Sequence, residues 1–399
     1  MKTRDRQFVI NHSADDVRQL ALQADRYPDV DLPWALQQIA GRQAAHNKIP
    51  TWAENPTVEY PVHLSLEQCS SETTARYKAS VVKRLFGKPS AMVDLTGGFG
   101  VDCAFLSEIF SQVTYVERNA DLCELAAHNF KALGLTHIQV VNADATEHLE
   151  TLPKVDFIYI DPARRNATGG RTYAIGDCTP DILTMKSTFF DHANLIMVKL
   201  SPMLDWHLAV EQMNSGSPCV AEVHIVSVKN ECKELLFILR KDFSAPLRIY
   251  CVNDQQTDVF TPSEAYPEPT QAQPQAGNYL YEPNASIMKS GCFAEMVHRY
   301  GLTTAGKHSH LFFTDHPIEN FPGRIFLITA VSTMNKKALS DALQGKTQAN
   351  ITVRNFPLTA EQLRKKLKMK DGGNCYIFAT TLADNQRKLI FCERWTKKK

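Results

Sequence analysis

The residues with the clearest chemical potential form a glycine-rich run, Val93-Asp94-Leu95-Thr96-Gly97-Gly98-Phe99-Gly100-Val101-Asp102. The run follows an apolar stretch typical of a strand and precedes a helical pattern, which is the context that a ligand-binding turn requires. Glycine tolerates a positive φ and lets a ligand approach the backbone closely. Asp94 and Asp102 flank the turn and offer carboxylates to an amino group of that ligand. Taken alone, the run fits a structural tight turn as well as a nucleotide site.

Two further acids follow the next two expected strands. Glu117 ends the stretch Val113–Val116, and a carboxylate at that point can accept hydrogen bonds from both hydroxyls of a ribose. Asp144 follows Ile138–Val141 and can accept from an exocyclic amine of adenine. Because ligands bind at the carboxyl ends of strands in open α/β sheets, acids in register at successive strand ends predict a nucleoside-binding site.

A third group of residues is suited to act on a second substrate. Asp161-Pro162-Ala163-Arg164-Arg165 follows the expected strand Phe157–Ile160. A carboxylate there can orient or deprotonate an acceptor, and an arginine can stack on a base or hold a phosphate. Lys199, at the end of Leu195–Leu200, can contact Asp161 or an acceptor phosphate. A solvated arginine pair and a surface lysine are the alternatives.

The loop after this motif carries glycines, as loops that close over active sites often do. It runs from Arg164 to Cys178 and contains Tyr173, which can supply an aromatic ring to the acceptor. The polar run Glu67–Lys78, upstream of the glycine-rich turn, is a second candidate cover for the site. Its candidate contacts are Gln68, Ser70, Ser71 and Thr74.

Strands and helices alternate through the region that positions these residues. The alternation predicts right-handed crossovers and a mostly parallel, doubly wound α/β sheet over residues 78–241. Its strands are continuous apolar runs, as expected when both faces of a sheet are covered. Val220–Val228 and Leu235–Lys241, separated by the polar turn Lys229–Glu234, predict a closing hairpin with one antiparallel strand.

The rest of the chain is expected to form three further regions. Residues 1–77 read as an N-terminal helical region, 242–323 as a proline-rich linker followed by a small α/β unit, and 324–399 as a small basic α+β domain. Residues 361–399 hold eleven Lys and Arg against four acids, whereas the whole chain of 399 residues has a net charge of only +1. Such local asymmetry suits a phosphate backbone, with Lys365, Lys366 and Lys368 as candidate contacts. A solvated helix face is the alternative.

Composition excludes several other classes of protein. No apolar run approaches the roughly 20 residues of a membrane span, and residues 1–10 lack the apolar core of a signal peptide. The ten cysteines include no C-x-x-C pair, so we expect neither a zinc site nor another metal. Scattered cysteines of this kind are typical of reduced thiols, which predicts a cytoplasmic protein without a membrane partner. Nothing in the sequence indicates an oligomeric state.

The successive motifs resemble those of class I methyltransferases that depend on S-adenosylmethionine (SAM). The resemblance rests on D-L-T-G-G-F-G-V-D at 94–102, V-E-R-N at 116–119, N-A-D-A at 142–145 and Y-I-D-P-A-R-R at 159–165. A closer resemblance is to bacterial methyltransferases with a C-terminal THUMP-like domain, including a Bacteroidetes type with a ferredoxin-like insert. It rests on the run from Glu67 to Tyr77, the motif Asp161–Arg165 and the tail Arg354–Leu358. The closing hairpin also fits this fold better than that of an NAD-dependent dehydrogenase.

The resemblance implies SAM as the cofactor and assigns the residues of its site. The expected cofactor-binding residues are Asp94, Thr96, Gly97, Gly98, Phe99, Gly100, Asp102, Glu117, Arg118, Asp144 and Ala145. The expected catalytic residues are Asp161, Pro162, Arg164 and Lys199. The expected substrate contacts are Arg165, Tyr173, Lys365, Lys366 and Lys368, because the likeness to RNA-binding THUMP domains favours tRNA or ribosomal RNA as the acceptor.

Other acceptors and mechanisms remain open at this point. Amine methyltransferases often carry an aromatic residue where this chain has Arg164, so an acceptor on a protein or small molecule is an alternative, as is a catalytically silent module that binds SAM or RNA. The D-P-x-R motif also resembles 5-methyluridine methyltransferases. Those enzymes need a cysteine nucleophile, and Lys199-Leu200-Ser201-Pro202-Met203 contains none, so we reject the 5-methyluridine mechanism for this chain. The methylated atom cannot be read from the sequence.

Overall fold

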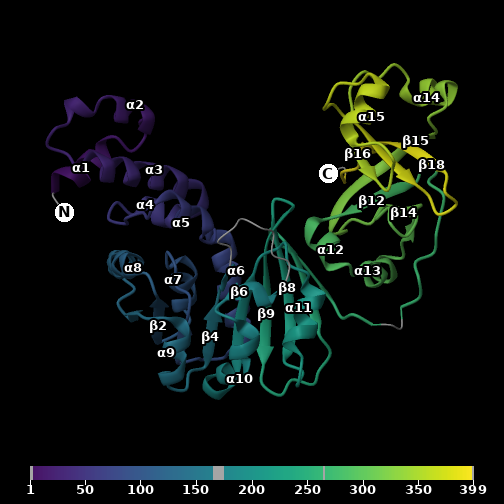
Figure 1. Ribbon diagram of the computed structural model, residues 1–399. Helices are drawn as coiled ribbons and strands as arrows, with labels where there is room; N and C mark the ends of the chain where they lie inside the picture. The colour runs from purple at the N-terminus through teal and green to yellow at the C-terminus, as the bar shows by residue number, and fades with distance from the viewer. Residues whose placement is uncertain (1–2, 165–174, 264–265, 398–399) are drawn as a thin grey trace. The chain divides into compact units, whose positions relative to one another are not determined.

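The computed structural model describes residues 3–164, 175–263 and 266–397 (Figure 1). The chain divides into two compact units, Met1–Ala221 with Leu235–Ala245 and Glu222–Glu234 with Pro246–Lys399. Each unit is described by itself below. No helix in the described ranges is both long enough and apolar enough to cross a membrane.

The first unit begins with helices, as the sequence predicts. They are α1 (Thr3–Asn11), α2 (Val17–Leu22), the 3₁₀ helix η1 (Ala24–Arg26), α3 (Leu32–Lys48), α4 (Pro50–Glu54), α5 (His63–Gln68) and α6 (Glu72–Leu85). Asp31 caps α3 by accepting a hydrogen bond from the backbone N–H of Trp34, and Ser71 caps α6 by accepting from that of Thr74. Apolar faces of α1, α2 and α3 form a small core that includes Phe8, Leu20 and Ile39.

The sheet of the first unit follows these helices. Its strands are β1 (Ala91–Asp94), β2 (Gln112–Glu117), β3 (Ile138–Asn142), β4 (Phe157–Ile160), β7 (Leu195–Leu200) and the part of β9 (Glu231–Arg240) from residue 235 onward. The connecting helices are α7 (Val101–Ser107), α8 (Ala120–Ala132), α9 (Ala145–Thr151), α10 (Ile182–His192) and α11 (Trp206–Met213). A short ribbon, β5 (Ala163–Arg164) with β6 (Cys178–Thr179), and the 3₁₀ helix η2 (Ile175–Asp177) lie after β4.

The strand order of this part is β9-β7-β4-β1-β2-β3, and the five strands from β7 to β3 are parallel. The chain proceeds outward from β1 to β3 and then returns to β4 on the other side of β1. This reversal is the switch point of a doubly wound sheet, where the crevice for a ligand opens at the carboxyl ends of the strands. The sequence predicts this α/β fold, and the structure confirms it.

The predicted closing hairpin is also present, with a tighter turn than expected. β8 (Val220–Val228) and β9 are neighbours in the strand order, and β9 runs antiparallel to β7. Only Lys229 and Asn230 separate the two strands, and both have a positive φ, of 52° and 60°. Two successive positive φ values are typical of a type I′ turn, whose twist suits two-residue hairpins. β9 therefore begins at Glu231, inside the segment that was expected to be the turn.

The second unit contains β8 paired in parallel with β10 (Arg248–Asn253), which pairs antiparallel with β11 (Gln256–Phe260). The prediction of a linker is wrong here, because residues 248–260 form strands. Prolines at 246 and 262 flank these strands and do not interrupt them. Residues 249–252 are a continuous apolar run and are all buried, so this run predicts a strand better than the nearby prolines predict a linker.

A seven-stranded sheet forms the rest of the second unit, in the order β13-β14-β12-β15-β18-β17-β16. Its strands are β12 (Tyr279–Pro283), β13 (Thr303–Thr304), β14 (Phe312–Thr314), β15 (Gly323–Ser332), β16 (Asn350–Arg354), β17 (Cys375–Thr381) and β18 (Arg387–Arg394). Its helices are α12 (Ala285–Ser290), α13 (Phe293–Tyr300), α14 (Lys336–Leu343) and α15 (Ala360–Leu367). The two small α/β regions expected from the sequence thus share one sheet, joined by the pairing of β12 with β15.

Candidate cofactor and acceptor site

The glycine-rich turn joins β1 to α7, and its glycines are there for steric reasons. Gly98 and Gly100 have φ values of 55° and 87°, which side-chain-bearing residues adopt only with strain. A Cβ on Gly97 would lie 2.0 Å from Cε2 of Tyr115, so only glycine fits against this ring. The hydroxyl of Tyr115 donates a hydrogen bond to the backbone carbonyl of Gly98. The backbone of the turn is therefore fixed directly above β2.

Glu117 ends β2 and faces this turn. Its Oε2 accepts a hydrogen bond of 3.0 Å from the N–H of Gly98, and its Oε1 accepts one of 2.9 Å from the N–H of Asn119. Each oxygen of a carboxylate has a second lone pair. The side chain can therefore accept further hydrogen bonds from a pair of hydroxyl groups while these two backbone bonds hold it in place.

Asp94, at the end of β1, is almost wholly buried, with 1% of its surface exposed. Its Oδ1 accepts a hydrogen bond of 3.0 Å from the N–H of Thr96. Burial raises the pKa of Asp94 well above its usual range, and neighbouring carboxylates, that of Asp102 foremost, raise it further. A cation that binds among these acids would favour their charged forms.

Asp102 lies in the first turn of α7 and is surrounded by polar groups from other elements. Its Oδ2 accepts hydrogen bonds of 2.7 Å from the hydroxyls of Ser70 and Tyr159. The Nζ of Lys78, a fully buried lysine on α6, lies 3.3 Å from Oδ1. Although burial opposes the charged form, the ammonium groups of Lys78 and Lys199 hold the pKa of Asp102 below its usual value.

One oxygen of Asp102 is held by charge and not by a hydrogen bond. Oδ1 is buried, and no described residue donates a hydrogen bond to it, although the ammonium group of Lys78 lies 3.3 Å away. An oxygen that is paired in this way can still accept a hydrogen bond from a donor group of a ligand. Beside the glycine-rich turn, it suits an ammonium group.

Asp161 and Lys199 come together on the other side of the switch point. The N–H of Asp161, just after β4, donates a hydrogen bond of 2.7 Å to the hydroxyl of Thr96. Lys199, at the end of β7, donates to Oδ2 of Asp161. The side chain of Asp161 remains one-third exposed. Thr96 therefore links the glycine-rich turn to the D-P-A-R-R motif, and Asp161 keeps one oxygen not held by Lys199.

Of the remaining residues of the D-P-A-R-R motif and its loop, the structure describes only some. Pro162 is buried, and Arg164 lies in β5, which pairs with Cys178 of β6. Arg165 and Tyr173 lie outside the described residues, so their predicted contacts stay predictions.

Asp144 lies at the end of β3 and acts as the N-cap of α9. It caps α9, where its Oδ1 accepts a hydrogen bond of 2.8 Å from the N–H of Thr146. This bond, with the nearby charge of Arg118, lowers the pKa of Asp144. Because Glu117 pairs with Asn142 across β2 and β3, Asp144 follows close to the end of the same strand pair. Ala145, the first residue of α9, is buried.

The three predicted lysine contacts lie in the second unit. Lys365 and Lys366 belong to α15 and Lys368 ends it; all three are exposed, whereas Leu363 and Leu367 are buried in the core. Lys365 forms an ion pair with Glu361 at 2.9 Å, with both side chains about three-quarters exposed. The helix thus presents its basic residues to solvent.

Two residues of the acid cluster were missed by reasoning from sequence. Tyr159 was treated as part of an apolar strand, and Lys78 only as the last residue of the polar run Glu67–Lys78, without a contact assigned to it. For Lys78 a signal exists: it stands three and four residues from Ala75 and Val82, both buried. A lysine on the buried stripe of an amphipathic helix indicates a buried negative partner.

Comparison with known proteins shows similarity to two domain families and to a solved structure of nearly the same length. Residues 279–322 match a family of ferredoxin-like domains and residues 323–394 match a family of THUMP-like domains. A crystal structure from Porphyromonas gingivalis W83, named provisionally as a methyltransferase, has 29% identity and a TM-score of 0.82, with 98% of each chain covered. The chain is similar to this protein over nearly its whole length. Its resemblance to bacterial proteins with a ferredoxin-like insert and a THUMP-like domain is thus confirmed.

Other likenesses are restricted to part of the chain. A SAM-dependent methyltransferase from Agrobacterium tumefaciens has 17% identity and a TM-score of 0.33, over 42% of this chain and 61% of its own. Trm5 of Methanocaldococcus jannaschii, solved with adenosine, has 15% identity and a TM-score of 0.30, over 42% and 49%. These scores are too low to bear on function. A search of curated proteins gave no match.

Proposed function

We propose that the chain is a SAM-dependent methyltransferase and that its acceptor is RNA. The observation that carries the cofactor assignment is the set of carboxylates around the glycine-rich turn, which are those of Asp94, Asp102 and Glu117. The likeness to the Porphyromonas gingivalis protein over nearly the whole chain supports the same reaction class.

The proposed cofactor contacts follow from these positions. Asp102, with Asp94 behind it, is suited to an ammonium group. Glu117 is suited to a pair of ribose hydroxyls, and Asp144 to an adenine amine. The backbone of the turn leaves room for a ligand beside Gly98, where a Cβ would have only the carbonyl oxygen of Thr96 within 4 Å, at 3.9 Å. When bound, SAM supplies a methyl group already activated by its sulfonium.

The chain's own part in the reaction is to hold the acceptor. Lys199 and the N–H bond to Thr96 fix Asp161 at the switch point, which leaves its second oxygen to orient an acceptor or receive a proton. Asp161 is the described residue best placed for this role, because it is partly exposed while Asp94 is buried.

Two observations support an RNA acceptor. The second unit matches a THUMP-like family over residues 323–394, and α15 in that stretch presents its lysines to solvent. Exposed lysines are suited to phosphate groups. Arg164 in place of an aromatic ring favours the second candidate, a methyltransferase that acts on a protein or small molecule.

A fractionated transfer assay tests the proposal. The protein is incubated with radiolabelled SAM and with total RNA or total protein from a strain that lacks the gene. Label in RNA, lost with Asp161→Asn while SAM affinity stays within about threefold, is the expected result. Lys186→Gln on α10 is a control outside the site. Label in protein moves the acceptor to the second candidate, and failure to bind SAM at all contradicts the cofactor assignment.

A further inference from the structure

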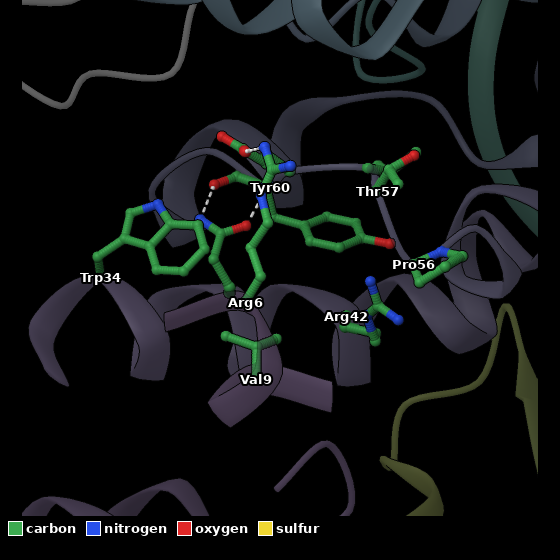
Figure 2. A pocket seen from close by; sticks show the side chains of 10 residues that line it. Arg6, Val9, Trp34, Arg42, Pro56, Thr57 and Tyr60 are labelled. Atoms are coloured by element: carbon green, nitrogen blue, oxygen red, sulfur yellow. Dashed lines mark hydrogen bonds and ion pairs between the residues drawn. The ribbon is translucent and has the colours of Figure 1, made fainter. Parts of the chain in front are cut away.

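A pocket in the N-terminal helices of the first unit contains polar groups that the cofactor site does not use (Figure 2). It lies between α1, α3 and the segment that leads to Tyr60. Val9, Trp34, Pro56 and Val58 give it apolar walls, and Arg6 and Arg42 reach it from two helices. The space open to the centre of a water-sized group is about 10 Å³. One small atom or group of atoms fits inside, and anything larger extends from the mouth.

The tyrosine of this pocket is held firmly by its backbone. The side chain of Gln38 donates a hydrogen bond to the carbonyl of Tyr60 and accepts one from its N–H, at 3.0 and 2.7 Å. On the same helix, a Cβ at Gly41 would lie 2.3 Å from Cβ of Tyr60, so a glycine is needed for this close approach. These contacts therefore fix the position of the Tyr60 ring, and only 1% of the residue is exposed.

The hydroxyl of Tyr60 nevertheless makes no hydrogen bond within the described part of the chain, and neither does Nε of Arg42. Figure 2 shows this hydroxyl directed to the same side as the guanidinium of Arg42, beside Pro56. Arg42 donates to the carbonyl of Asn55 at 3.3 Å, and no described acid forms an ion pair with it. Two residues that line the pocket therefore each have a buried donor atom without an acceptor.

The charged residues of the pocket indicate what kind of acceptor atom a ligand would supply. Arg6 is occupied by Glu59 at 2.8 Å, and His128 lies 3.5 Å from the same carboxylate, so the only acid of the lining is already paired. Burial raises the pKa of Tyr60 to about 12, which keeps its hydroxyl protonated and able to donate at neutral pH. An arginine N–H and a phenol hydroxyl together suit a negatively charged oxygen.

Tyr60 also contacts the turn of the cofactor site. Its ring centroid is 6.3 Å from that of Phe99, and the ring centroid of Trp52 is 5.1 Å from that of Phe99. These separations are typical of aromatic contacts. A change in the position of the Tyr60 ring would therefore alter the packing of Phe99, a residue of the glycine-rich turn.

We propose that this pocket is a second ligand site, which binds one oxygen of a small oxyanion between Arg42 and Tyr60, and that its occupancy is coupled to cofactor binding through Phe99. The ligand class is a phosphate or carboxylate group whose remaining atoms lie at the mouth. The binding half stands without the proposed function, whereas the coupling half rests on the proposed cofactor site.

Binding is tested by calorimetry with sodium phosphate and sodium acetate, each against sodium chloride of equal ionic strength, on the full chain without cofactor. Saturable binding of either anion is expected. It should weaken about tenfold in Arg42→Gln, as for the loss of a charged hydrogen bond. Tyr60→Phe should weaken it by a smaller factor without lowering Tm, because the lost hydroxyl has no protein partner. Arg18→Gln, an exposed arginine on α2, should leave it unchanged.

Other outcomes overturn the proposal. If neither anion binds, or if Arg42→Gln and Tyr60→Phe bind like the wild type, the pocket holds a structural water only. Coupling is measured as the affinity for S-adenosylhomocysteine with and without the anion, and a change of about fivefold is expected, with the reciprocal change in anion affinity. An anion that binds without such a change overturns the coupling half and leaves the proposed function untouched.

Discussion

Lys78 and Asp102 form an ion pair between two helices, with Nζ and Oδ1 3.3 Å apart and the lysine wholly buried. Lys78 lies on α6, upstream of the sheet, whereas Asp102 lies on α7 directly after the glycine-rich turn. Ser70 joins the two, because its hydroxyl accepts from Lys78 at 3.2 Å and donates to Asp102 at 2.7 Å. The N-terminal helices are thereby connected to the candidate cofactor site through charge as well as packing.

Lys78→Met should destabilise the first unit strongly. The substitution leaves the Asp102 carboxylate buried without its cation, and breaking a buried pair in this way costs about 3–5 kcal/mol. Urea unfolding would measure the loss. The double variant Lys78→Met, Asp102→Asn removes both charges and should recover much of the stability, whereas Lys83→Met, on an exposed position of the same helix, should change little. Additive effects of the two single changes would show that the pair is not coupled.

Asp94→Asn should become more stabilising as pH rises. Burial raises the pKa of Asp94 in the folded protein above its unfolded value, so the folded state binds more protons and the wild type loses stability as pH rises from about 4 toward the folded pKa. Asparagine avoids this loss and keeps an oxygen for the N–H of Thr96. The free energy of unfolding, compared at pH 5 and pH 8, should diverge from the wild type by at most about 1.4 kcal/mol per pH unit.

Asp144→Asn provides the matched control for that experiment. Its pKa is lowered in the folded state, mainly by the bond from Thr146, so its contribution is complete above the unfolded pKa and is lost only as pH falls below about 4. Between pH 5 and pH 8 its difference from the wild type should be constant. A constant difference for Asp94→Asn as well would contradict the assignment of a raised pKa to Asp94.

Most strands of the sheet could be predicted because the pattern that marks each strand lies within a short stretch of sequence. Each strand of the first unit is a short apolar run bounded by turn residues, and the acids that follow β1, β2 and β3 are adjacent to those runs in the sequence. The strand order follows from the known fold of similar sequences and from right-handed crossovers. The hairpin turn was expected to be longer than it is, because Glu231–Glu234 are polar as a group although they form the beginning of β9.

The partners across the site could not be predicted, because they come from distant parts of the chain. Ser70 and Tyr159 reach Asp102 from 32 and 57 residues away. Ser70 was predicted as a contact of the site, but its bond to Asp102 was not. No periodicity encodes which side chains meet in the crevice. The pairing of Asp161 with Lys199 was open as one of two roles for the lysine, and the structure shows that contact. Tyr60 was not singled out at all, since a lone tyrosine between prolines carries no pattern.

Gly97→Ala should impair both folding and cofactor binding. The new Cβ would lie 2.0 Å from the Tyr115 ring, so the turn or the ring must move, and overpacking of this kind costs about 1–3 kcal/mol. Thermal unfolding and calorimetry with S-adenosylhomocysteine would measure the two effects. Gly87→Ala has no atom within 4 Å of the new Cβ and an ordinary φ, and it should match the wild type. Unchanged cofactor affinity in Gly97→Ala would place the ligand away from this turn.

Charge reversal on α15 should weaken RNA binding and flatten its dependence on salt. Lys365, Lys366 and Lys368 are exposed, and each phosphate contact that is lost lowers the slope of log affinity against log salt by about 0.7–0.9. The triple Lys→Glu variant should therefore lose roughly 2 units of slope in fluorescence anisotropy with an RNA oligonucleotide. Lys336→Glu with Lys337→Glu, exposed on α14 of the same unit, is the matched control. If the slope of log affinity against log salt is the same in the α15 and α14 variants, α15 contributes only general positive charge. The RNA is then bound by another surface.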